Sequence, residues 1–223
     1  MSSGRLRGKI SASPATPRLV LRIAAIVLAA GESRRMEGAN KLLMELDGRA
    51  VVSWVVEAVR GAGIPDIYVV VGHQADEVRR AVGAADVTFV DNQAYATGMA
   101  TSLRAGVAAL PEDVNAALIC LGDMPRVTAA DVRVVIGAFD PAMTREICIP
   151  TYDGRRGHPV LFAARFLPEI EALRGDVGAR SVIERHPAVV HLVAVDHPGV
   201  LLDVDTPAAL RSLSRANAPE RPT

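Results

Sequence analysis

Hydrophobic runs and helix-like stretches alternate along most of this chain. Several of the hydrophobic runs are continuous, which is typical of strands covered on both faces of a sheet. Strands are predicted at residues 23–28, 67–71, 87–90, 116–121, 147–149, 159–162 and 189–195. Helices are predicted at residues 51–60, 76–82, 101–110, 129–139, 166–173, 179–185 and 207–214. This order predicts an α/β protein, a three-layer α/β/α sandwich around a Rossmann-like, mostly parallel sheet.

The chain is long enough to bury one substantial core. It has 223 residues, of which 50% are hydrophobic. No internal repeat or long linker divides it, so we expect a single domain at residues 23–215. Residues 1–22 are basic, rich in Ser and Pro and without an acidic residue, so they are expected to form a disordered extension. Residues 216–223 are expected to form a loose tail.

Charge and cysteine content narrow the range of partners. Lys plus Arg and Asp plus Glu number 25 each, so no overall field attracts nucleic acid or a membrane surface. The hydrophobic runs are shorter than the roughly 20 residues that span a membrane. Cys120 and Cys148 lie in strand-like runs and are expected to be buried and reduced, which favours a cytoplasmic location. Any anion-binding site must therefore be local.

Several loops are expected to meet at one edge of the sheet. In a doubly wound sheet, ligands bind beyond the carboxyl ends of the strands. The loops that follow strand-like runs or lie near their ends are residues 28–41, 72–73, 98–99, 122–125 and 203–206. We therefore expect these loops to form one site.

The loop after the first predicted strand has the composition of a phosphate-binding loop. Small residues at Ala29, Ala30 and Gly31 let backbone N–H groups approach an anion, and Arg35 and Lys41 supply positive charge. The sequence contains neither G-x-x-x-x-G-K-[ST] nor G-x-G-x-x-G, so neither a P-loop NTPase nor a standard dinucleotide oxidoreductase is supported. The alternative is that both cations are solvated loop charges.

Two aspartates follow predicted strands at positions suited to a hard cation. Asp123 lies in Gly-Asp-Met-Pro directly after a buried run, and Mg²⁺ takes one or two carboxylates together with substrate phosphates. Asp205 is the second candidate, with Asp203 close by. The alternatives are a turn-capping role for Asp123 and a helix-capping context for Asp205 before Thr206.

Other candidate residues have simpler interpretations beside the functional ones. Gly98 opens a predicted helix whose first N–H groups are able to bind an anion, although an ordinary N-cap is the alternative. Arg155 and Arg156 are expected to lie on a solvated surface, and the alternative is that they face the phosphate of a substrate. No zinc site is expected, because no ligand-spaced pair occurs among His73, His186, His191 and His197.

The first loop and six later motifs resemble the MobA-like nucleotidyltransferase family. Residues 28–43 read LAAGESRRMEGANKLL against the family pattern LAAGxSxRMGxxNKLL, with a displaced glycine at Gly38. The later motifs occur in the family's order: VVGHQADEV at 70–78, GMATSL at 98–103, LGDMPRV at 121–127, GHPVLF at 157–162, GDVGAR at 175–180 and LLDVDTP at 201–207. The set is most similar to the molybdenum cofactor cytidylyltransferase (MocA-like) branch, which implies a fold of the nucleotide-diphospho-sugar transferase type.

The resemblance implies a reaction and a set of site residues. The implied reaction is Mg²⁺-dependent transfer of CMP from CTP to the phosphate of molybdenum-loaded molybdopterin, releasing pyrophosphate. The implied catalytic residues are Lys41, Arg35 and Asp123, and the implied metal ligands are Asp123 and Asp205. The implied nucleotide-binding residues are Leu28, Ala29, Ala30, Gly31, Arg35, Lys41, Gly72 and Gly98. The implied acceptor-binding residues are Gly157, His158, Asp176 and Arg180.

The resemblance also implies which nucleotide the protein uses and which proteins it contacts. Guanylyl-transferring relatives usually carry LAGG in the first loop, so Ala30 favours cytosine. The family implies transient contact with a xanthine dehydrogenase-type molybdoenzyme or its chaperone. The alternatives are GTP or another phosphorylated acceptor, and a non-catalytic nucleotide- or cofactor-binding chaperone that could lose Asp123. The presence of Lys41, Arg35, Asp123 and Asp205 together favours catalysis.

Overall fold

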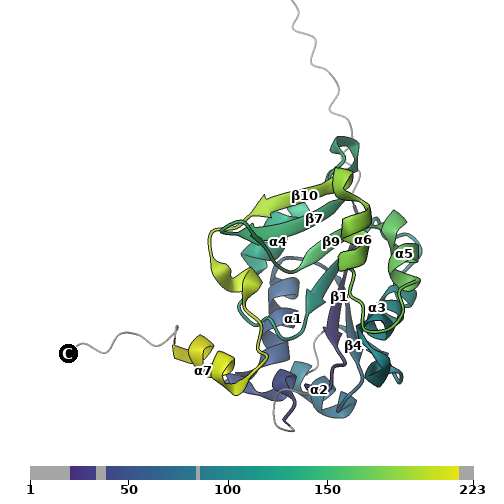
Figure 1. Cartoon of the computed structure of the whole chain (residues 1–223). Coiled ribbons are helices and arrows are strands. Elements are labelled where there is room, and N and C mark those ends of the chain that lie inside the picture. The colour runs from purple at the N-terminus through teal and green to yellow at the C-terminus, as the bar shows by residue number, and fades with distance from the viewer. Residues whose placement is uncertain (1–20, 34–38, 84–85, 216–223) are drawn as a thin grey trace, which may run out of the picture.

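The computed structural model describes residues 21–33, 39–83 and 86–215 (Figure 1). Arg35 and most of the expected extension and tail lie outside the described residues. Where the described chain begins, Arg22 forms ion pairs with Asp66 and Asp113 at 2.8 and 2.5 Å. Its backbone N–H also donates to the Asn115 side chain at 2.8 Å. These contacts fix the chain at the start of the first strand.

A mixed sheet forms the centre of the molecule. Its strands are β1 (Ile23–Ala29), β4 (Asp66–Val71), β5 (Thr88–Asp91), β6 (Ala116–Leu121), β7 (Ile147–Tyr152), β8 (Arg155–Arg156), β9 (Val160–Ala163) and β10 (Val190–Ala194). The order is β10-β7-β9-β6-β1-β4-β5, and β8 pairs with β7. Strands β5, β4, β1 and β6 are parallel, whereas β9 is antiparallel to β6 and β7. The predicted α/β fold class is confirmed.

Helices cover both faces of the sheet (Figure 1). They are α1 (Val51–Gly61), α2 (Ala75–Val82), α3 (Met99–Ala108), α4 (Ala129–Gly137), α5 (Leu167–Glu171), α6 (Arg180–Arg185) and α7 (Pro207–Arg215). Helix α1 packs against α2 and α4, while α3 packs against α5 and against β1 and β4. No helix in the described part of the chain is long and hydrophobic enough to cross a membrane.

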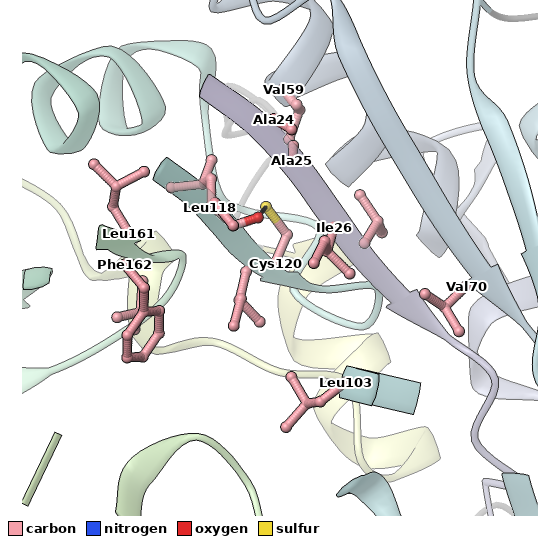
Figure 2. Packing of buried hydrophobic residues seen from close by; sticks show 14 of the residues in the cluster. Ala24, Ala25, Ile26, Val59, Val70, Leu103, Leu118, Cys120, Leu161 and Phe162 are labelled. Atoms are coloured by element: carbon pink, nitrogen blue, oxygen red, sulfur yellow. Dashed lines mark hydrogen bonds between the residues drawn. The ribbon is translucent and has the colours of Figure 1, made fainter. Parts of the chain in front are cut away.

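Strand β1 lies at the centre of the core and at the switch point of the sheet. Ala24, Ala25, Ile26 and Val27 have no exposed surface. Figure 2 shows Ile26 in the same hydrophobic cluster as residues of α3, β4 and β6. The chain continues from β1 to β4 and β5 on one side and later returns to β6 on the other. Loops after β1 and β6 therefore diverge around a crevice, which is where ligands bind in sheets of this type.

A short hairpin that the hydrophobic pattern did not predict supports the last helix. It joins β2 (Glu45–Leu46) to β3 (Arg49–Ala50) through Asp47 and Gly48, both with positive φ, as a type I′ hairpin turn requires. Together with α1 and α7 it forms a second hydrophobic cluster, made of Leu46, Val51, Val204, Leu210 and Leu213. This cluster holds the chain segment that precedes α7.

Candidate active site

A lysine and two aspartates from distant parts of the chain meet at the carboxyl edge of the sheet. The Lys41 Nζ atom lies 2.5 Å from Asp123 Oδ2 and 2.7 Å from Asp205 Oδ1. The three side chains are largely buried, with 17%, 16% and 25% of their surface exposed, respectively. The expected convergence of the first, fourth and last loops is therefore present in the structure.

Backbone and side-chain contacts hold each member of this cluster in place. Lys41 begins a short 3₁₀ helix, and its N–H donates to Ser33 Oγ at 3.1 Å. Asp123 follows β6 after one glycine, so the sheet itself directs its side chain to the edge. The N–H of Val204 donates to the Asp123 carbonyl at 2.8 Å, which brings Asp205 alongside.

The electrostatics of the cluster favour cations. Burial by itself would lower the pKa of Lys41, but the charges and hydrogen bonds of Asp123 and Asp205 outweigh it and raise that pKa. Burial, then the negative charges of Asp205 and Asp123, raise the pKa of Asp203. Asp123 Oδ1 is buried without a hydrogen-bond partner among the described residues. An oxygen in that state is a natural ligand for a cation.

The described residues contain no group of three or more His, Cys, Asp or Glu side chains that could hold a metal ion. Asp123 and Asp205 nevertheless fit Mg²⁺, because this ion usually takes one or two carboxylates and completes its shell with water and substrate phosphates. The main observation in favour of a cation here is that the buried Asp123 Oδ1 has no hydrogen-bond partner among the described residues.

A first cavity of about 390 Å³ opens beside the cluster. Of the residues expected to bind nucleotide, it is lined by Leu28, Ala30, Gly31, Lys41 and Gly98. Asp123 also reaches it. Its walls therefore combine a small-residue strand end with the charged cluster, as a nucleotide site requires.

Two residues expected at the nucleotide lie behind the cavity wall. Ala29 is buried, and Gly72 packs so closely that an added Cβ would lie 2.7 Å from Tyr95 Cβ and 2.9 Å from Ala30 Cβ. The His73 N–H donates to the Ala30 carbonyl at 3.2 Å. Gly72 therefore shapes the first loop from behind.

Gly98 lines the first cavity, but close packing against a neighbouring loop is what requires glycine at this position. It has φ +121°, and an added Cβ would lie 2.6 Å from the Gly175 carbonyl. The loop at Gly175 and Asp176 also occupies the start of α3: Ala100 N–H donates to Gly175 O, and Met99 N–H donates to Asp176 Oδ1, both at 3.2 Å. These two N–H groups at the start of α3 are therefore already engaged by protein atoms.

A second cavity of about 690 Å³ adjoins the first. Leu28, Met99 and Leu121 line both. The second cavity combines hydrophobic side chains such as Phe162 with three arginines, Arg155, Arg156 and Arg180. The two cavities thus offer places for two substrates on either side of a shared wall.

The residues expected at the acceptor divide between the cavities. Gly157, His158 and Arg180 line the second, whereas Asp176 lines the first. Arg180 is exposed and donates to Glu184 at 2.8 Å, one helical turn away. Arg155 and Arg156, on the exposed strand β8, bring two further positive charges to the second cavity.

The surroundings of His158 disfavour the charged form of its ring. Burial lowers its pKa, although the charge of Asp123 and a hydrogen bond with the Ile119 backbone act in the opposite direction. Its Nδ1 atom is buried without a hydrogen-bond partner among the described residues. Such a ring suits a polar contact with the second substrate better than an ion pair with its phosphate.

The lowered pKa of His158 gives a pH prediction. The unfolded chain takes up a proton on this ring as the pH falls through about 6.5, whereas the folded chain resists it, so stability is lost below that pH. We expect His158→Gln to lose less stability than the wild type between pH 8 and pH 5, measured by urea unfolding. Parallel losses in the two proteins would contradict the burial argument.

Sequence reasoning missed much of the cavity wall. The first cavity is also lined by Glu32, Leu42, Tyr95, Ala96, Thr97 and Ser102. The second is also lined by Leu103, Ile119, Ile149, Gly154, Val160, Ile183 and Glu184. The position of Tyr95 just before the GMATSL motif could have indicated that it lies at the cavity. The hydrophobic side chains gave no signal, because a cavity wall and a core have the same composition.

Comparison with known proteins adds family information to this geometry. The sequence model of the MobA-like NTP transferase domain matches residues 25–190. Nicotine blue oxidoreductase of Paenarthrobacter nicotinovorans is 28% identical over 189 residues, which cover 82% of this chain and 92% of that protein. The bifunctional protein GlmU of Kineococcus radiotolerans is 31% identical over 195 residues, covering 83% of this chain but 35% of that protein.

Solved structures agree with the fold. Rv0371c from Mycobacterium tuberculosis H37Rv superposes with a TM-score of 0.76 at 32% identity, covering 87% of this chain and 98% of that one. A structure of the same protein in complex with manganese gives a TM-score of 0.71 at 29% identity with the same coverage. Manganese is therefore present in a structure of a similar protein.

Proposed function

We propose a specific reaction for this chain, which belongs to the MobA-like NTP transferase domain family. The proposed reaction transfers CMP from CTP to the phosphate of molybdenum-loaded molybdopterin. Membership of the family supports nucleotidyl transfer as the general reaction. The choice of CTP, the acceptor and Mg²⁺ are our proposal.

The observation that carries the proposal is the position of the charged cluster beside two adjoining cavities. Lys41 and Asp123 line the first cavity, which shares Leu28, Met99 and Leu121 with the second. A nucleotide in the first cavity would place its phosphates near Lys41. An acceptor with a hydrophobic body and a phosphate suits the second, because its wall combines hydrophobic side chains with arginines.

The chemistry needs positioning and charge neutralisation. An acceptor phosphate has its second pKa near 6, so its oxygen is anionic at neutral pH and needs no general base. This oxygen attacks the α-phosphorus of CTP, the bond to the β-phosphate oxygen breaks, and pyrophosphate leaves. Lys41 would neutralise charge on the phosphates, and Arg35 is proposed to assist it.

Asp123 and Asp205 would hold Mg²⁺ through their carboxylates. When bound, the metal would neutralise phosphate charge and orient the triphosphate. In the described structure Lys41 Nζ lies between the two carboxylates, so the cluster already accommodates one positive charge there. The burial of these groups keeps that neutralisation strong.

Location and client are further parts of the proposal. Cys120 and Cys148 are buried free cysteines, and burial raises the pKa of the Cys148 thiol to about 11. Two inert thiols favour the cytoplasm as the site of the reaction. Delivery of the product to a xanthine dehydrogenase-type molybdoenzyme would follow, through a transient contact.

The name of one relative raises a second class of function. Nicotine blue oxidoreductase is similar over most of its length. In this chain, however, Lys41 lies between the carboxylates of Asp123 and Asp205 beside the first cavity, an arrangement that suits phosphates and a cation. That cluster favours phosphate chemistry.

A pyrophosphate-release assay separates these functions. Purified protein with Mg²⁺ would be given CTP, GTP, ATP or UTP, with and without molybdenum-loaded molybdopterin, and NADPH consumption would be followed in parallel. We expect acceptor-dependent pyrophosphate release with CTP. Turnover with GTP alone would overturn the cytidylyl assignment, and NADPH oxidation without nucleotidyl transfer would overturn the transferase.

Nucleotide choice is predicted to depend on Ala30. This residue lines the first cavity, and we propose that the size of its side chain limits the space available to the base. Ala30→Gly is expected to lower the preference for CTP over GTP by about tenfold, a change of the size that one methyl group contributes in a pocket. The ratio of kcat/KM for the two nucleotides measures it, and an unchanged ratio would place base selection elsewhere.

A further inference from the structure

The chain segment that delivers Asp205 is fixed to the protein at several points. We call residues 197–205 the Asp205 strap. It contains the 3₁₀ helix Pro198–Leu201, and its last residue contacts Lys41 Nζ at 2.7 Å. At its first residue, His197 Nε2 lies 3.0 Å from Asp131 Oδ1. The strap therefore joins the cluster to the start of α4.

The anchor at His197 is well defined. Its Nδ1 accepts a hydrogen bond from the Gly199 N–H at 3.1 Å, so a neutral ring carries its proton on Nε2 and donates it to Asp131. Asp131 is 3% exposed, and its other oxygen accepts from the N–H and hydroxyl of Thr128 in the capping box of α4. The anchor thus rests on a buried helix cap.

The middle of the strap packs on the acceptor-side residues. The His158 N–H donates to the Val200 carbonyl at 2.9 Å. Gly157 approaches the same carbonyl so closely that an added Cβ would lie 2.2 Å from it. The Val204 N–H then donates to the Asp123 carbonyl. The position of the strap is therefore linked to both sides of the proposed site.

The geometry points to His197 as a positioning residue for Asp205, an inference that rests on the proposed function. Neither His197 nor Asp131 lines either cavity, so neither is placed to touch a substrate. His197 acts on the cluster through the backbone of the strap. The far end of the strap is held separately, because Val204 packs with Leu46 and Leu210. Loss of His197 should therefore loosen the strap without unfolding the domain.

The first test measures the strap directly. Amide hydrogen exchange would be compared in full-length wild type, His197→Ala and His197→Gln, since Gln offers an N–H to Asp131. We expect exchange of peptides covering residues 199–205 to rise by about tenfold in His197→Ala and to be restored in part by Gln. Unchanged exchange, or an equal rise in peptides from β6, would overturn the inference.

The second test is a double-mutant cycle with Asp205→Asn. If His197 acts through Asp205, His197→Ala should lower kcat in the wild type but have almost no further effect in Asp205→Asn. Independent losses that multiply would overturn the inference, as would normal turnover of Asp205→Asn. His191→Ala, which changes a histidine on β10 outside the strap, serves as the control and should behave as wild type.

The two proposals fail in distinguishable ways. Wild-type protein that releases no pyrophosphate with CTP and the molybdopterin acceptor would overturn the proposed function. Hydrogen exchange of the strap requires no substrate, so it would still confirm or overturn the anchoring by His197.

Discussion

Lys41→Ala is expected to lower the rate of pyrophosphate release by at least about 100-fold, equivalent to roughly 3 kcal/mol of transition-state stabilisation. The Lys41 ammonium is held at 2.5 and 2.7 Å from two carboxylates beside the first cavity, so it is preorganised before any substrate binds. Its removal also leaves Asp123 and Asp205 without their shared cation. The measurement is kcat at saturating CTP and acceptor.

Lys41→Arg provides the informative control. Lysine occurs at positions 9 and 41 only, in a chain that otherwise uses arginine for its positive charges. A compact ammonium fits between two carboxylates, whereas a planar guanidinium has a different shape and different donor directions. We therefore expect Lys41→Arg to remain strongly impaired despite keeping the charge. Near-normal rates in Lys41→Ala would mean that the triphosphate is held elsewhere.

The site was predictable where a local rule fixed it. In doubly wound sheets, ligands bind beyond the carboxyl ends of the strands, and this rule predicted that the loops of Lys41, Asp123 and Asp205 lie together. The three side chains meet in the structure. The pairing of Arg180 with Glu184 was also open to prediction, because residues four apart on a helix are neighbours. Both inferences need only chain order and the regular geometry of helices and sheets.

Contacts between distant loops could not be predicted in the same way. Asp176 was expected at the acceptor, but it lines the first cavity and accepts from the Met99 N–H. Gly98 was expected to approach the nucleotide, and its tightest neighbour is instead the Gly175 carbonyl. The antiparallel direction of β9 was equally hidden, because a hydrophobic run has the same composition in either direction. Each of these features depends on tertiary packing.

Asp123→Asn is expected to raise the Mg²⁺ concentration needed for half-maximal activity by at least about 100-fold. Changing a residue that only hydrogen-bonds to a metal ligand already costs about 10- to 100-fold in metal affinity or activity, and Asp123 is proposed as a direct ligand. Its Oδ1 is buried and lacks a hydrogen-bond partner among the described residues, so an amide here would lose charge where the cation is proposed to bind. Activity would be titrated with Mg²⁺ and with Mn²⁺.

Asp203→Asn is the matched control, because Asp203 lies in the same acidic stretch as Asp205 but is exposed and does not contact Lys41 in the described structure. Removing its charge weakens the local negative field, so a shift of a few-fold in the metal titration is expected from electrostatics alone. The two variants differ in what they remove, a ligand in one and a nearby charge in the other. An Asp123→Asn titration that shifts no further than that of Asp203→Asn would make Asp123 a contributor to the field and leave Asp205 to hold the metal.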